Sequence, residues 1–251
     1  NDKIIIHRIK VPNHYNSMFS QAYMYIIYAF SAYKVSKKIN PIFIIGSTSR
    51  LMTGLLAGFS SWRLGCKYFI DLRDIFSETI SDLFLRRSKI LGSIFKIMFT
   101  FLEKKLLKNA SGVNVVSEDF SDYFKKESID VSNWSFYPNG VDKEFLNSSL
   151  SNKTNYKNVK SILYVGNIGS GQGLKTILPA VAKKIGNSYQ FLLIGDGRER
   201  ASLEENIKNN NIDNIKILSP VLRKNLIKHY HDADILFLHL NNLPAFQRVL
   251  P

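Results

Sequence analysis

Short runs of apolar residues alternate along this chain with longer segments in which apolar residues recur every three or four positions. The short runs are typical of buried strands, and the longer segments are typical of amphipathic helices. In the first half the pattern predicts strands at 3–7, 41–46, 67–71, 112–116 and 134–137, and helices at 18–37, 51–64, 90–108 and 118–126. Such an alternation indicates a parallel sheet covered by helices.

The composition changes at residues 147–160, where Ser, Asn, Lys, Thr and Tyr leave almost no apolar residue for a core, so this segment is interpreted as a linker. A second alternating unit follows, with strands at 162–165, 191–194, 215–218 and 235–240 and helices near 174–185, 198–209 and 222–231. We therefore predict an α/β chain of two doubly wound, Rossmann-like domains, at 1–146 and 161–251. No strand and glycine turn open the first domain, and no helix closes the second. Both domains are therefore expected to be incomplete, in a fragment or in a natural short form.

Charge and cysteine content narrow the classes of partner. The chain has 251 residues, 45% of them apolar, and a net charge of +14, which favours an anionic partner such as nucleic acid, acidic lipid or a phosphorylated substrate. Its single cysteine, Cys66, has no neighbouring base and is expected to be a packing residue in a reducing compartment. The five histidines are scattered, so no metal site is expected.

A glycine-rich loop is the strongest candidate for chemistry. The apolar run Ser161–Val165 ends in glycines at 166, 169, 171 and 173, and a helical pattern begins at Leu174. A strand, a glycine loop and a helix N-terminus in this order can bind phosphate through backbone N–H groups and the helix dipole, although a tight turn is the simpler alternative. A nicotinamide cofactor is disfavoured, because Asp196 follows Gly166 by about 30 residues instead of about 20.

Five segments in order resemble the family-4 retaining glycosyltransferases of the GT-B fold. Residues 164–174 are similar to the family's donor-phosphate loop, and further similarities lie at 114–118, 137–142, 193–197 and 231–235. Residues 71–78 and the Gly-Gln-Gly loop are similar to bacterial O-antigen and capsule transferases for acetamido deoxysugars, of the N-acetyl-L-fucosamine type. Two features depart from the family. Asn167 and Gln172 replace its Arg and Lys, and its acidic signature would begin beyond Pro251.

The resemblance implies transfer of an acetamido deoxysugar from a nucleotide sugar, UDP-linked, to a polyprenyl-diphosphate-linked saccharide in O-antigen or capsule biosynthesis, with no cofactor. Arg73 and Asp74 are the implied catalytic residues, with a salt-bridged loop pair as the alternative. The other implied site residues are Asn167, Gly169, Gly171, Gln172 and Gly173 for the donor phosphates, and Asp196, Gly197 and Val221 near the nucleotide.

The segment 85–108 is an apolar and strongly basic helix. Apolar residues at 91, 94, 95, 98 and 102 share one face. The segment contains seven Lys or Arg residues and a single acidic residue, Glu103. We expect Arg86, Arg87, Lys89 and Lys96 to face anionic lipid, which would place the protein peripherally on the inner side of the cytoplasmic membrane. Packing of the helix on the sheet, with solvated lysines, is the alternative. Nucleic acid is disfavoured as the partner because the chain carries no zinc-finger motif and no aromatic ribonucleoprotein motif.

Two alternatives to a transferase stay open. One is an inactive GT-B-like binding or scaffold module that retains a vestigial phosphate loop. The other is a GT-B sugar-nucleotide epimerase, which would need acid and base residues that the sequence does not reveal.

Overall fold

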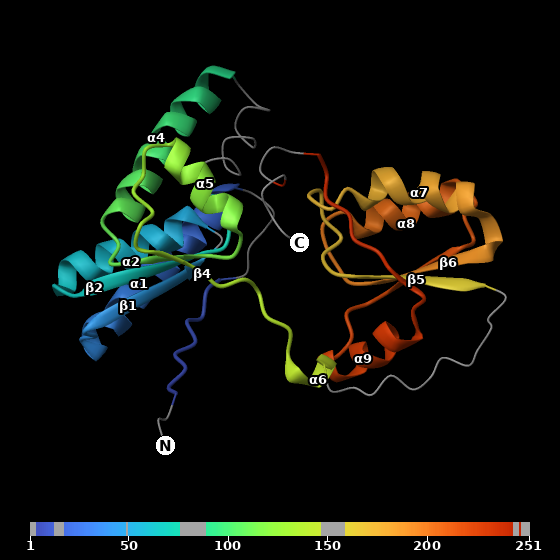
Figure 1. The fold of residues 1–251 in the computed structure, drawn as a ribbon, viewed down its shortest axis with the longest axis horizontal. Coiled ribbons are helices and arrows are strands. Elements are labelled where there is room, and N and C mark those ends of the chain that lie inside the picture. Colours follow the sequence, from blue (N-terminus) through green and yellow to red (C-terminus); the bar gives the residue numbers. More distant parts are fainter. Residues whose placement is uncertain are drawn as a thin grey trace. The chain divides into compact units, whose positions relative to one another are not determined.

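A computed structural model describes residues 4–12, 18–48, 50–75, 89–146, 159–242 and 246. The chain divides into two compact units, one of Asn1–Asn139 with Arg248–Leu250 and the other of Gly140–Gln247 with Pro251 (Figure 1).

The first unit is built on a parallel sheet of four strands in the order β1-β2-β3-β4. The strands are β1 (Phe43–Thr48), β2 (Lys67–Leu72), β3 (Val113–Val115) and β4 (Trp134–Phe136), and the helices are α1 (Met18–Ile39), α2 (Leu51–Leu64), α4 (Lys89–Lys108) and α5 (Glu118–Lys126). Neighbouring strands pair in register from Phe43 with Lys67 to Val115 with Phe136. Their carboxyl ends therefore share one edge of the sheet.

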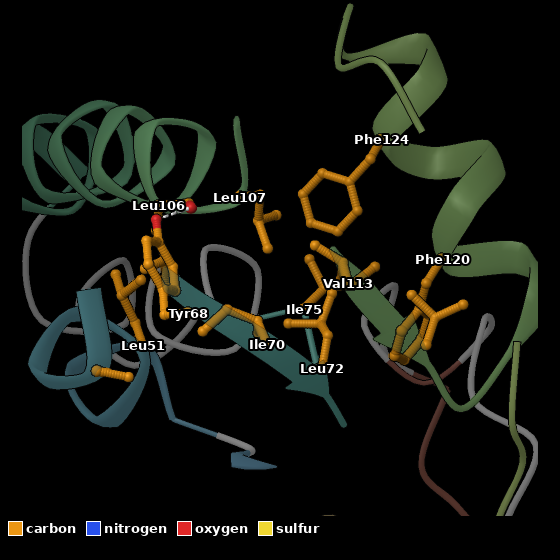
Figure 2. Close-up of a cluster of buried hydrophobic side chains, with 12 residues drawn as sticks. Leu51, Tyr68, Ile70, Leu72, Ile75, Leu106, Leu107, Val113, Phe120 and Phe124 are labelled. Carbon is orange, nitrogen blue, oxygen red and sulfur yellow. Dashed lines mark hydrogen bonds between the residues drawn. The ribbon is translucent and has the colours of Figure 1, made fainter. Parts of the chain in front are cut away.

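The core of the first unit lies between β2, β3 and the helices α4 and α5 (Figure 2). Alternate residues of β2 are buried, and Ile70 and Leu72 are fully enclosed. The α5 residues Phe120 and Phe124 are also fully buried in this cluster. Tyr68 donates its hydroxyl hydrogen to the carbonyl oxygen of Leu106, at 2.6 Å, so its polar end is satisfied inside the core.

The second unit is a parallel sheet in the order β7-β6-β5-β8. Its strands are β5 (Lys160–Val165), β6 (Tyr189–Ile194), β7 (Ile215–Leu218) and β8 (Ile235–Leu236), and its helices are α6 (Lys143–Leu146), α7 (Leu174–Ile185), α8 (Arg200–Asn209) and α9 (Arg223–Asp232). The chain moves outward from β5 to β7 and then returns to the other side of β5 with β8. The order of strands reverses at this point, and such a reversal is where open α/β sheets bind ligands.

The predicted α/β class with parallel sheets is confirmed, and α7 has the predicted bounds. The strand predicted at 3–7 is wrong. Residues 4–7 form no strand, and Ile4, Ile5 and Ile6 are 89%, 76% and 69% exposed. A short apolar run becomes a strand only when a neighbour pairs with its backbone. Most of the predicted linker, residues 147–158, lies outside the described residues.

Candidate functional site

The glycine-rich loop of the second unit follows β5 and leads into α7, as predicted. Backbone hydrogen bonds join it to the chain that follows β6. Gly166 N donates to Ile194 O at 3.1 Å, and Ile168 N donates to Asp196 O at 2.8 Å. Ile168 itself is buried in the core of the unit. The start of the loop is therefore held in place on its β6 side.

The other side of the loop is held by residues that follow β8. Nδ1 of His239 lies 2.7 Å from the carbonyl oxygen of Gln172, and Asn241 N donates to Gly171 O at 2.8 Å. The side-chain amide of Asn241 also donates to the carbonyl oxygen of Ser170. Three consecutive carbonyl groups of the loop thus point toward the β8 side. These three carbonyls accept hydrogen bonds on the β8 side, and the start of the loop is held on the β6 side. The shape of the loop is therefore set by contacts beside both strands that neighbour β5.

Two glycines make this close packing possible. Gly173 has a φ of +59°, and a Cβ at this position would collide with the side-chain oxygen of Asn241. A Cβ at Gly195 would collide with the backbone carbonyl of Gly166. A side chain at Gly173 would also pay for a left-handed backbone conformation. These positions therefore require glycine for steric reasons.

The loop and the first turn of α7 offer unpaired N–H groups. Gly173 is the N-cap of α7 and supplies no side-chain cap. Within residues 159–242, the backbone N–H groups of Gly173, Leu174 and Lys175 donate to no other residue. Such N–H groups, together with the positive end of the helix dipole, favour an anion. Nδ2 of Asn167 donates to Oε1 of Gln172 at 3.0 Å, so two of the residues predicted to bind the donor phosphates contact each other.

The remaining predicted residues of this unit lie after β6 and β7, at the same edge of the sheet. Asp196 is exposed directly after β6, and its Oδ1 accepts a hydrogen bond from Gly197 N at 2.8 Å. Val221 is half-buried after β7 and packs against a small cluster that includes Leu163 and Ile194. The edge thus gathers the loop, Asp196, Gly197 and Val221, and their contact with a nucleotide stays a prediction.

The first unit has a second polar edge, formed by side chains at the carboxyl ends of its strands. Asp71 is the second-last residue of β2. It accepts hydrogen bonds from Ser47 Oγ at 2.6 Å, Asn114 Nδ2 at 2.8 Å and Arg73 Nε at 2.9 Å. Arg73 Nη1 donates to Asn139 Oδ1 at 2.7 Å. We call Ser47, Asp71, Arg73, Asn114 and Asn139 the Asp71 cluster.

The pKa of Asp71 reports the balance of forces in this cluster. Burial alone would raise it, because a charged carboxylate loses hydration. The hydrogen bonds from Ser47, Asn114 and Arg73, with the charge of Arg73, outweigh that penalty and hold the pKa of Asp71 below its ordinary value. Asp71 is therefore an ionised carboxylate in the folded protein at neutral pH.

Of the two predicted catalytic residues, Arg73 lies in the Asp71 cluster and Asp74 directly follows it in the chain. The ion pair of Arg73 is formed with Asp71, at 2.9 Å, so a salt bridge does exist at this loop. Asp71, Ser47, Asn114 and Asn139 were missed as site residues, as were His239 and Asn241. Their shared signal is a polar residue at or just past the end of an apolar strand. Among the described residues, no group of three or more His, Cys, Asp or Glu could hold a metal ion.

Comparisons with known proteins agree with this architecture. Residues 148–242 match the family model "Glycosyl transferases group 1". No curated protein matches the chain. Sucrose-phosphate synthase from Thermosynechococcus elongatus has a similar solved structure, with a TM-score of 0.68 and 17% identity over 97% of this chain and 63% of that one.

Two further solved structures are similar. HepE of Anabaena in complex with UDP and glucose has a TM-score of 0.56 and 13% identity over 89% of this chain and 58% of that one. The lipopolysaccharide outer core galactosyltransferase WaaB in its apo form has a TM-score of 0.52 and 13% identity over 88% and 56%. The chain thus has the GT-B type of α/β fold, and it spans about three fifths of the length of these structures.

Proposed function

We propose that the protein is a glycosyltransferase that takes its sugar from a nucleotide-sugar donor. The observation that carries the proposal is the loop 166–173, which is held by hydrogen bonds on both sides and ends in N–H groups at the start of α7 that donate to no other residue of 159–242. The match of residues 148–242 to the glycosyltransferase family model covers this loop. In this proposal the N–H groups bind the donor diphosphate and stabilise charge on the leaving nucleotide.

The donor is proposed to be UDP-linked, and the transfer is proposed to retain the anomeric configuration. HepE, which has a similar fold, is described in complex with UDP and glucose, and this supports a uridine nucleotide. The loop supplies no Lys or Arg of its own, since Asn167 and Gln172 occupy the two positions at which the family that the sequence resembles has Arg and Lys. Diphosphate binding would therefore depend on backbone N–H groups, with Asp196, Gly197 and Val221 near the nucleotide.

The proposed acceptor is a polyprenyl-diphosphate-linked saccharide of O-antigen or capsule biosynthesis, and the sugar is proposed to be an acetamido deoxysugar. The sequence 71–78 supports this assignment through its resemblance to transferases of that type. Arg73 and Asp74 are the proposed catalytic residues. They follow β2 at the carboxyl edge of the first sheet, the edge at which α/β sheets place their ligands.

We further propose that α4 rests on the inner face of an anionic membrane. Ile90, Ile94, Ile97 and Phe101 recur at helical spacing and are 75%, 57%, 72% and 63% exposed. Lys96 is exposed beside them, Arg86 and Arg87 lie outside the described residues, and only the backbone of Lys89 is described. An exposed apolar stripe with basic neighbours is what an interfacial helix needs.

The apolar face of α4 differs from the predicted one. Phe99, Leu102 and Leu106 contact the core, whereas Ile94 and Met98 are 57% and 41% exposed. The prediction placed residues 91, 94, 95, 98 and 102 on one face, whereas the structure separates Leu102 from Ile94 and Met98. A helix with apolar residues on two sides has no unique stripe in its sequence. In the described part of the chain, no helix is long and apolar enough to span a membrane.

The proposed function is tested with the full-length protein and a set of UDP-sugars. Calorimetry with UDP measures binding, and release of UDP measures turnover of each UDP-sugar. Binding of UDP together with turnover of one donor supports a transferase. Binding without turnover of any donor, with a lipid-linked acceptor present, would favour a binding module. Interconversion of the free sugar nucleotide would identify an epimerase instead.

A further inference from the structure

We propose that Asp71 is a positioning residue that fixes the guanidinium of Arg73 for contact with oxygen atoms of the bound substrate. The inference rests on the proposed function, and it adds to the site a residue that binds no substrate itself.

Both carboxylate oxygens of Asp71 are engaged by donors of the protein. Its Oδ2 accepts hydrogen bonds from Ser47 Oγ and Arg73 Nε, and its Oδ1 accepts one from Asn114 Nδ2. The Asp71 side chain is 15% exposed, whereas the Arg73 side chain is 47% exposed. The carboxylate thus faces the protein and the guanidinium faces outward, so any direct contact with substrate falls to Arg73.

Arg73 is attached through two different nitrogen atoms. Nε donates to Asp71 Oδ2 at 2.9 Å, and Nη1 donates to Asn139 Oδ1 at 2.7 Å. Because the guanidinium is planar, contacts to two of its nitrogens fix the orientation of the whole group. Lysine at this position would keep the charge and lose this orientation.

The support behind Asp71 is itself rigid. Asn114 is 8% exposed, and its side chain links two other segments of the first unit. Its Nδ2 donates to Asp71, while its Oδ1 accepts a hydrogen bond from Tyr137 N at 2.9 Å. Ser47 approaches Asp71 from the end of β1, the strand on the other side of β2. Asp71 is therefore held by hydrogen bonds from both neighbouring strands. Its fixed position in turn fixes the position of the Arg73 guanidinium.

The donors that Arg73 keeps include both N–H groups of Nη2, for which the described residues of the first unit supply no acceptor. Two N–H groups held in a known plane match the oxygen atoms of a sugar or phosphate, which are hydrogen-bond acceptors. Because these groups are already held in place, binding avoids the loss of side-chain conformational entropy that a free arginine would undergo. Asp71 thus contributes to recognition without touching the ligand.

The substitution Asp71→Asn removes this support with little change in shape. One carboxylate oxygen becomes an NH₂ group, so the side chain loses the ion pair with Arg73 and can no longer accept hydrogen bonds from both Arg73 and Asn114. We therefore expect the Arg73 guanidinium to be released, and kcat/KM for the turned-over UDP-sugar to fall about 30-fold, the scale of a hydrogen bond to a charged group. Asp130→Asn is the matched control. Asp130 also has a lowered pKa and accepts a hydrogen bond from Ser132 N at 2.9 Å, yet it lies outside the cluster.

A double-mutant cycle on the full-length protein tests the inference. If Asp71 acts through Arg73, Asp71→Asn lowers kcat/KM about 30-fold in the wild type and less than about 2-fold in the Arg73→Ala background. Equal losses in the two backgrounds would overturn the positioning role and leave Asp71 as a structural residue. Asp130→Asn should leave kcat/KM unchanged in both backgrounds.

A second readout does not depend on turnover. In ¹⁵N NMR spectra of the full-length protein, the fixed Arg73 guanidinium should give separate, slowly exchanging Nη signals, assigned by their loss in Arg73→Lys. These signals should merge in Asp71→Asn and persist in Asp130→Asn. Merged signals in the wild type would contradict the inference. Separate signals without turnover of any donor would support the positioning of Arg73 and contradict the proposed transferase.

Discussion

Nδ1 of His239 lies 2.7 Å from the carbonyl oxygen of Gln172, one residue before the glycine that caps α7. A carbonyl oxygen only accepts, so a hydrogen bond at this contact requires a proton on Nδ1. The His239 ring also stacks against Phe237, with an interplanar angle of 3°. A residue that follows β8 thus holds the loop that begins at β5.

This relationship predicts how changes at His239 affect UDP. His239→Ala removes the donor to Gln172, and we expect UDP affinity to fall about 5-fold, since one such hydrogen bond contributes about 1 kcal/mol. His239→Asn places an amide N–H near the position of Nδ1 and should retain most of the affinity. Calorimetry compares the three proteins. An alanine variant that binds UDP as tightly as the wild type would show that His239 does not set the loop's shape.

Asp74 is expected to matter for turnover more than for stability. It follows Arg73 at the exit of β2, where the proposed reaction takes place. Asp74→Asn should lower kcat about 100-fold, the scale for losing a positioned acid–base group, while the melting temperature stays within a few degrees. Steady-state kinetics and thermal denaturation measure the two quantities. A normal kcat, or a variant that fails to fold, would contradict this role.

The lowered pKa of Asp71 predicts a pH dependence of stability. In the folded protein the carboxylate is stabilised relative to the unfolded chain, in which the pKa of the group is near its ordinary value of 3.8. Its contribution is therefore complete above that value and disappears as the pH falls through the lower pKa of the folded state. Asp71→Asn should destabilise the protein at pH 7 and much less at pH 3. Urea denaturation at the two pH values measures the difference, and a destabilisation that is equal at both would contradict the assignment.

The exposed face of α4 predicts salt-sensitive binding to anionic vesicles. Arg86, Arg87, Lys89 and Lys96 should each contribute about 1 kcal/mol near an anionic surface, and salt screens this attraction over about 10 Å at 0.1 M. Changing these four residues to Gln should release the protein from anionic vesicles in co-sedimentation. The same change at Lys125, Lys126, Lys183 and Lys184 is the matched control for net charge. Equal binding to neutral and anionic vesicles, or equal release by the control, would contradict the proposal.

Much of the fold follows from patterns within short segments. The strand at Lys67–Leu72 and the helix at Leu174–Ile185 were predicted because each carries its own periodicity and its own turn residues. The run at 3–7 has the same local character, yet it forms no strand. Strand formation needs a partner, which no local pattern contains. The face of α4 was misjudged for a related reason, since its apolar residues lie on more than one side.

The candidate site was predictable only where its residues are consecutive. The glycines at 169, 171 and 173 lie within one loop, so their spacing could be interpreted directly. His239 and Asn241 reach that loop from about 70 residues away, and they meet it because β8 pairs with β5. Likewise, Ser47, Asp71 and Asn114 come together through the register of β1, β2 and β3. Strand order, which the sequence alone leaves open, determines these contacts.

The central claim is that the loop before α7 binds the donor diphosphate, and two glycines of the same backbone conformation test it most directly. Gly173, the N-cap of α7, has φ +59° and ψ +23°, and Gly65, the C-cap of α2, has φ +66° and ψ +26°. A Cβ at Gly173 would collide with Asn241, whereas a Cβ at Gly65 would meet nothing within 4 Å. Alanine at either position therefore carries a similar backbone strain, and only Gly173→Ala deforms the loop. Calorimetry with UDP on the full-length protein should show binding lost in Gly173→Ala and unchanged in Gly65→Ala. Equal UDP affinity in the two variants would contradict the account.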